Sequence, residues 1–192
     1  MSKFFASFIP ASAAPLTQAR AKVLVATCFA LGAAILALLL YWIVFSWLEQ
    51  IETVLVGLVL ILLLAGILAL VKSGRVPAAA WALTIFLLLL NLLNMLDYGI
   101  GTTSSAGLII AIVLASFTLG PWLGLGTAAL GSLAAFGIAL GGSAGLLHTE
   151  IPFVESNLSF DAVALTLIYL LVGLLCAVWS KAANEALVTN HP

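Results

Sequence analysis

The sequence has few charged residues. Of 192 residues, six are Lys or Arg and seven are Asp or Glu, whereas 65% are hydrophobic. The mean hydropathy of +1.32 is far above what the core of a water-soluble protein of this length requires, which excludes a soluble domain. Because one bilayer crossing takes about 20 apolar residues, the length allows roughly six crossings. We therefore predict an all-α integral membrane protein with a bundle of six transmembrane helices.

Histidine and cysteine are equally scarce, which limits metal and haem chemistry. His148 falls in a predicted loop and His191 stands beside the C-terminus, so no histidine pair can ligate a haem inside the bundle. Cys28 and Cys176 lie in apolar runs, where free thiols are expected. The sequence also lacks a metal-ligand cluster, a phosphate-binding loop and a nucleophile elbow. We expect no enzyme activity, no metal and no nucleic-acid partner. A lipid, quinone or carotenoid stays open as a ligand, because such molecules need only an apolar groove.

The apolar runs divide the chain into three parts. Residues 1–21 are predicted to be an interfacial, cytoplasmic segment, residues 22–180 the transmembrane domain and residues 181–192 a short cytoplasmic tail. The spans are expected at 22–47, 53–71, 77–96 and 161–179, together with two arms of a hairpin over 105–142. Gly120 and Pro121 interrupt this hairpin and are predicted to form its turn.

The basic residues predict the orientation. A cytoplasmic N-terminus places every Lys and Arg inside: Lys3, Arg20, Lys22, Lys72, Arg75 and Lys181. All acidic residues except Glu185 then fall outside: Glu49, Glu52, Asp97, Glu150, Glu155 and Asp161. Because cytoplasmic loops of membrane proteins are enriched in Lys and Arg, both termini are expected in the cytoplasm.

Small side chains recur at helical spacing on three of the spans. Such stripes let helix backbones approach closely in lipid, where dispersion contacts drive association. We predict that the two arms of the hairpin pack through Gly107, Ala111, Ala115, Gly124, Ala128, Gly131 and Ala135. The first span carries a second stripe at Ala26, Ala30 and Ala34, which is expected to pack against another helix.

The third span carries polar residues on one helical face. Asn91, Asn94 and Asp97 are spaced at i, i+3 and i+6, and Thr84 lies two turns earlier. Amides in hydrocarbon are costly unless they are hydrogen-bonded, so this face is expected to look into the bundle or into a water-filled recess. Two interpretations follow: a binding site for a small polar ligand, or hydrogen bonds that join neighbouring helices. Tyr169 lies in mid-span, where its hydroxyl needs a partner within the bundle.

The hairpin resembles a known class of membrane domain. Its Leu119-Gly120-Pro121 turn, preceded by an outer loop rich in Gly, Ser and Thr at 99–104, is similar to the multi-span N-terminal domains of bacterial sensor histidine kinases and diguanylate cyclases. In that family the last span continues into a signalling helix and a catalytic output domain. Only residues 180–192 follow the last span here. The resemblance implies a stand-alone sensor or ligand-binding module in a bacterial cytoplasmic membrane.

The alanine stripe of the first span carries a second resemblance. The substrate-binding S-components of energy-coupling-factor vitamin transporters are six-span proteins of similar length, and their first span packs through alanines against the coupling subunit. Ala26, Ala30 and Ala34 are similar in kind. Of the three hypotheses, we favour a non-catalytic accessory subunit of a larger membrane assembly, such as a photosynthetic or respiratory complex. Its partners would be membrane lipid and other transmembrane proteins.

Overall fold

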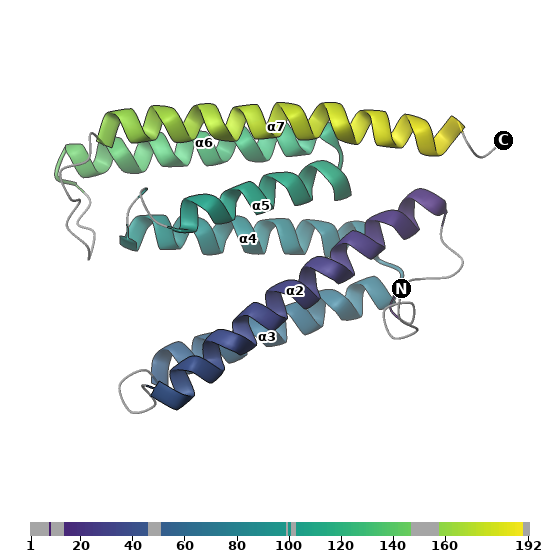
Figure 1. The fold of residues 1–192 in the computed structure, drawn as a ribbon, viewed down its shortest axis with the longest axis horizontal. Helices are drawn as coiled ribbons and strands as arrows, with labels where there is room; N and C mark the ends of the chain where they lie inside the picture. Colours follow the sequence, from purple (N-terminus) through teal and green to yellow (C-terminus); the bar gives the residue numbers. More distant parts are fainter. Residues whose placement is uncertain are drawn as a thin grey trace. The chain divides into compact units, whose positions relative to one another are not determined.

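Helices make up most of the residues that the computed structural model describes, which are 8, 14–45, 51–98, 100, 103–146 and 158–189. Figure 1 shows the helices. In chain order they are α2 (Pro15–Phe45), α3 (Ile51–Lys72), α4 (Val76–Tyr98), α5 (Thr103–Thr118), α6 (Pro121–Ser143) and α7 (Leu158–Thr189). Strands are absent from these described ranges. The all-α prediction is confirmed.

Five of these helices are long and apolar enough to cross a membrane, and α5 is shorter. With 16 residues and a rise of about 1.5 Å per residue, α5 is about 24 Å long, less than the roughly 30 Å hydrocarbon core. The sequence predicted a full span here. Thr118 ends the helix because Gly120 and Pro121 follow, so the first arm of the hairpin is shorter than the second.

The outer bounds of two helices also differ from the predicted spans. α2 begins at Pro15, seven residues before the predicted start, and Pro is well suited to the first turn of a helix. α7 continues to Thr189, through most of the predicted tail, because the segment after Lys181 contains good helix formers and neither Gly nor Pro. The predicted outer loop at 143–160 lies largely outside the described residues, as do His148 and His191.

The chain divides into two compact units, Met1–Leu83 and Thr84–Pro192. The first unit contains an antiparallel hairpin of α2 and α3. A Cβ on Gly32 would lie 4.0 Å from Leu64 Cδ1, and one on Gly57 would lie 3.0 Å from Leu39 Cγ. From Gly32 to Leu39 the residue number rises along α2, whereas the facing residue on α3 falls from Leu64 to Gly57. The two helices are therefore antiparallel. This register puts Lys22 and Lys72 at the same end of the hairpin.

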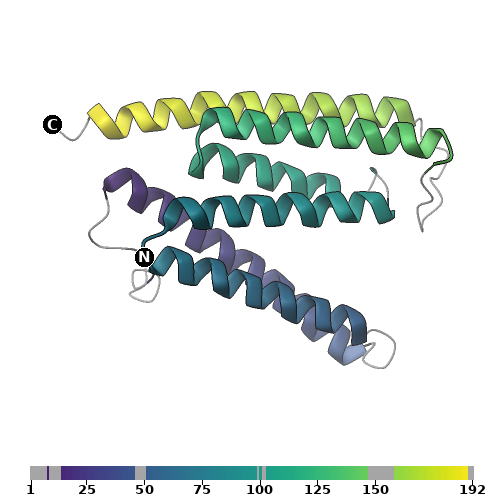
Figure 2. The ribbon, with the colours of Figure 1, turned by 180° about the vertical axis from the view of Figure 1, so that it is seen from behind.

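The second unit contains the remainder of α4 together with α5, α6 and α7. Figure 2 shows α6 and α7 side by side, and α5 packs against both. Tyr169 pairs with Ser105 and Ser180 with Ser116, at the same sequence separation of 64, so α5 and α7 are parallel. α6 runs antiparallel to both. The hydrophobic core of the second unit joins these four helices. Its buried members are Met95, Ile100, Leu108, Ile112, Ala128, Ala135, Ile138, Ala139, Ala162 and Tyr169.

Two turns depend on glycine. Gly74 between α3 and α4 has a φ of 80°, and Gly120 between α5 and α6 has a φ of 122°, a region that residues with a Cβ rarely adopt. Pro121 then occupies the first turn of α6, as predicted for the hairpin. Pro77 likewise falls in the first turn of α4. The short turn at Gly120 reverses the chain between α5 and α6, which pack against each other.

Candidate functional site

Asn91 is the most deeply buried of the three predicted ligand residues on α4. Its side chain is 8% exposed and its amide nitrogen donates a 2.7 Å hydrogen bond to the Leu87 carbonyl of the same helix. A Cβ built on Gly107 of α5 would overlap the Asn91 amide, with the Asn91 Cγ only 2.6 Å away. The glycine therefore leaves the space that the amide fills. This arrangement brings Asn91 and Gly107 together at a close approach of α4 and α5.

The other two predicted ligand residues are less enclosed, whereas Thr84 of the same face is buried. Asn94 is half-buried and Asp97 is exposed near the end of α4. Thr84 is 2% exposed, and its hydroxyl has no hydrogen-bond partner among the described residues. The face thus changes from buried to exposed along the helix. The structure places the three predicted ligand residues in different environments along α4.

The hairpin arms meet through small residues at several levels. A Cβ on Gly124 would lie 2.7 Å from Ser116 Cβ, so α5 and α6 approach closely just after their turn. Gly131 is more loosely surrounded, because a Cβ there would meet Leu108 and Tyr169 at 3.6 and 3.7 Å, ordinary contact distances. The four predicted alanines are fully buried: Ala111, Ala115, Ala128 and Ala135.

Gly173 of α7 completes this seam, although it was not among the small residues predicted to pack. A Cβ on Gly173 would lie 2.7 Å from the Ala128 Cβ, too close to be accommodated without a shift of the helices. Ala177 follows Gly173 by four residues, and this small-xxx-small spacing was the signal available in the sequence. α7 is therefore a third partner of the hairpin.

Side-chain hydroxyls link α7 to the hairpin through backbone carbonyls. Tyr169 donates a 2.8 Å hydrogen bond to the Ser105 carbonyl, which confirms the prediction that its hydroxyl has a partner in the bundle. Ser180 donates at 2.8 Å to the Ser116 carbonyl. Ser132 of α6 donates to the Ala128 carbonyl and lies 3.5 Å from the Thr166 carbonyl of α7. These contacts fix the register of α7 against α5 at two points, about three helical turns apart.

The alanine stripe of α2 is exposed. Ala26, Ala30 and Ala34 are all exposed, and so are Ala33 and Ala37 beside them. Since an α-helix has about 3.6 residues per turn, these alanines lie opposite the buried positions Leu24, Cys28 and Leu39. α2 thus has one face packed within its unit and a smooth alanine face directed away from it.

Cys28 is buried, Cys176 is half-buried, and both are free thiols, as predicted. Over the part of the chain that the structure describes, no three His, Cys, Asp or Glu residues lie together as metal ligands. Comparison with protein-family models, with curated proteins and with solved structures found no match.

Proposed function

We propose that this multi-pass membrane protein is a non-catalytic accessory subunit that joins a larger membrane assembly by helix packing. The exposed alanine face of α2 carries the proposal. Lipid chains are as apolar as leucine, so helix association in a membrane gains mainly from close packing, which small residues permit. The exposed positions of α2 outside this face include the larger side chains Leu36, Leu38 and Leu40, which suit lipid.

The proposed arrangement has six spans with both termini in the cytoplasm, in a bacterial cytoplasmic membrane. The confinement of all Lys and Arg residues to one side in the predicted topology supports this orientation. α5 is included as a span because it packs against α6 and α7. A helix shorter than the bilayer can be accommodated by local thinning of the membrane.

Copurification in a gentle detergent tests the proposal. The wild-type chain should migrate on a native gel with a partner at a fixed stoichiometry. Ala30→Leu adds bulk at the centre of the alanine face and should release the partner while the folded yield remains level. Leu38→Phe adds a similar number of atoms at an exposed position outside the face and should retain it. A wild-type chain that migrates alone, or equal loss in the two variants, would contradict the proposal.

A second candidate function is that of a substrate-binding S-component. The exposed alanine face favours it, because the resemblance to that family concerns the same three alanines of the first span. The same copurification separates the two candidates: an S-component would bring down a transporter module with ATPase activity, whereas an accessory subunit would bring down a complex without one.

A further inference from the structure

A groove lies between the first turn of α6 and the latter part of α7. It has a volume of about 230 Å³ and is lined by Pro121, Trp122, Leu125, Ala177, Val178 and Lys181. Five of these six residues are apolar, and Lys181 alone carries a charge. At about 30 Å³ per water molecule in the liquid, the volume corresponds to roughly eight waters, enough for a phosphate-sized group or the upper part of one acyl chain.

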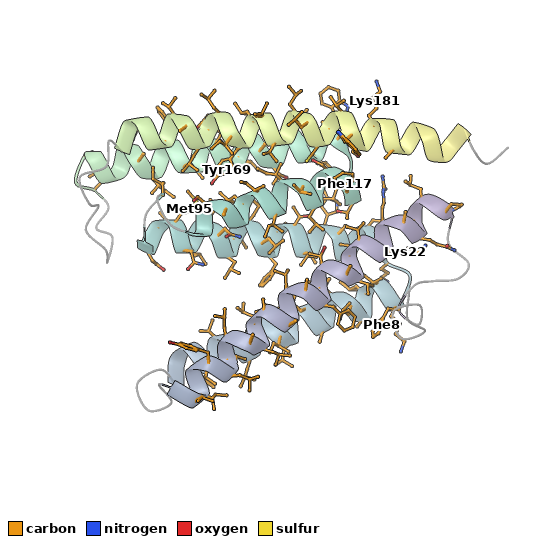
Figure 3. The ribbon with its side chains drawn as sticks, in the orientation of Figure 1. Phe8, Lys22, Met95, Phe117, Tyr169 and Lys181 are labelled. Carbon is orange, nitrogen blue, oxygen red and sulfur yellow. The ribbon has the colours of Figure 1, made fainter. Side chains whose placement is uncertain are left out.

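The residues around the groove are typical of the membrane interface. Trp122 is 83% exposed and Trp179, beside the groove on α7, is 70% exposed, an unusual exposure for the largest side chain in a folded protein. Tryptophan favours the level of the lipid headgroups. Lys181 is also exposed and ends the apolar part of α7 (Figure 3). These positions put the groove at the boundary between acyl chains and headgroups.

Charge determines which occupant fits. The Lys181 ammonium stands at the end of an otherwise apolar groove, a pattern that matches an anionic headgroup attached to hydrocarbon. The first turn of α6 adds donors, because the backbone N–H groups of Trp122 and Leu123 have no backbone acceptor among the described residues. Glu185 follows Lys181 by four residues in the sequence.

We propose that this groove binds an anionic phospholipid. The headgroup phosphate would lie between Lys181 and the first turn of α6, and the upper part of an acyl chain would lie along Leu125, Ala177 and Val178. A site of this kind would anchor the α6 and α7 end of the second unit at one face of the membrane. This binding role is additional to the docking of a protein partner on α2.

Native mass spectrometry of the purified chain tests the lipid site. The protein is titrated in mild detergent with phosphatidylglycerol or with zwitterionic phosphatidylcholine. We expect one retained phosphatidylglycerol and a preference over phosphatidylcholine of about fivefold, the effect expected of one basic residue near anionic lipid. Lys181→Gln should abolish the preference, whereas Lys72→Gln, an exposed lysine at the end of α3, should preserve it.

A second variant tests the groove without changing the charge. Val178→Phe fills the groove at a residue that is 60% exposed, so its folding should be unaffected, and retention of either lipid should fall. The proposal is overturned if the wild type retains phosphatidylcholine as well as phosphatidylglycerol, or if Val178→Phe leaves lipid retention unchanged. It is also overturned if Lys181→Gln keeps the preference for phosphatidylglycerol or if Lys72→Gln loses it. Displacement of the lipid by excess glycerol phosphate would assign the site to free phosphates instead.

Discussion

Individual glycines set the distances between helices in the second unit. A Cβ at Gly107, Gly124 or Gly173 would meet a neighbouring helix at 2.9 Å or less, whereas one at Gly126 or Gly137 would meet nothing within 4 Å. All five glycines lie in apolar helices, so composition alone does not distinguish the glycines in close contact from those in open space. The effect of adding a methyl group therefore depends on how near the facing helix lies.

Gly173→Ala should destabilise the second unit. The new methyl group would lie 2.7 Å from the Ala128 Cβ, and overpacking of this kind typically costs about 1–3 kcal/mol. The measurement is the thermal midpoint of unfolding in detergent. Gly137→Ala is the matched control, because its methyl group enters open space and should leave the midpoint unchanged or raise it slightly. A control as damaging as Gly173→Ala would mean that helix contact is not the cause.

Tyr169→Phe should lower the thermal midpoint by a smaller amount. The variant keeps the ring but removes the hydroxyl that donates to the Ser105 carbonyl of α5, and interhelical hydrogen bonds in membrane proteins contribute about 0.6 kcal/mol on average. Thr27→Val serves as the control, since the Thr27 hydroxyl bonds only within its own helix, to the Val23 carbonyl. Equal midpoints for Tyr169→Phe and the wild type would show that this hydrogen bond does not stabilise the α5 and α7 pair.

At the scale of the helix, sequence patterns predicted which segments are helical better than they predicted where each helix begins and ends. The apolar runs identified each of the six helices in the described part of the chain, since lipid leaves the backbone few alternatives. The predicted turn at Gly120 and Pro121 leaves a first arm of about the observed length of α5, but this arm was expected to be a full span and is shorter than one. The close approach of α7 to the hairpin was not predicted, because Gly173 stands in a leucine-rich run.

The polar face of α4 distinguishes a packing role from a ligand site. Asn91→Leu removes the buried amide beside Gly107 and should lower the thermal midpoint, whereas Asn94→Leu, at a half-buried position, should lower it less. If the face binds a polar ligand instead, Asn91→Leu should leave the midpoint level while partner activity falls. Greater destabilisation by Asn94→Leu would show that the contact of Asn91 with α5 is unimportant.

At the scale of the whole molecule, composition and charge predicted a multi-pass membrane protein but not its partners. The interacting surfaces depend on which helix faces remain uncovered, and this requires the packing of α2 against α3. The sequence marked Ala26, Ala30 and Ala34 as small, and the structure adds that they are exposed together with Ala33 and Ala37. Equivalent stripes on α5 and α6 are buried, so spacing alone does not separate an internal seam from an outer docking face.

The proposed topology predicts which sites are reachable from each side of the membrane. A cysteine introduced at Ser73, in the exposed turn between α3 and α4, or at Thr189 should react with a membrane-impermeant reagent only from the cytoplasm. Cysteines at Thr102 and Ser156 should react only from outside. In the proposed topology one span separates Ser73 from Thr102, two spans separate Thr102 from Ser156, and one span separates Ser156 from Thr189. A single reversed site would therefore overturn the six-span arrangement.

Cross-linking in native membranes tests the central claim, docking through α2, most directly. In a chain whose Cys28 and Cys176 are replaced by alanine, a cysteine introduced at Ala30 or at Leu38 carries a photoactivated cross-linker. We predict a discrete protein adduct from position 30 and none from position 38, and the mass of the adduct shows whether the partner is a second copy or another protein. The absence of an adduct at position 30, or equal adducts at both positions, would contradict the proposal that the alanine face docks a helix.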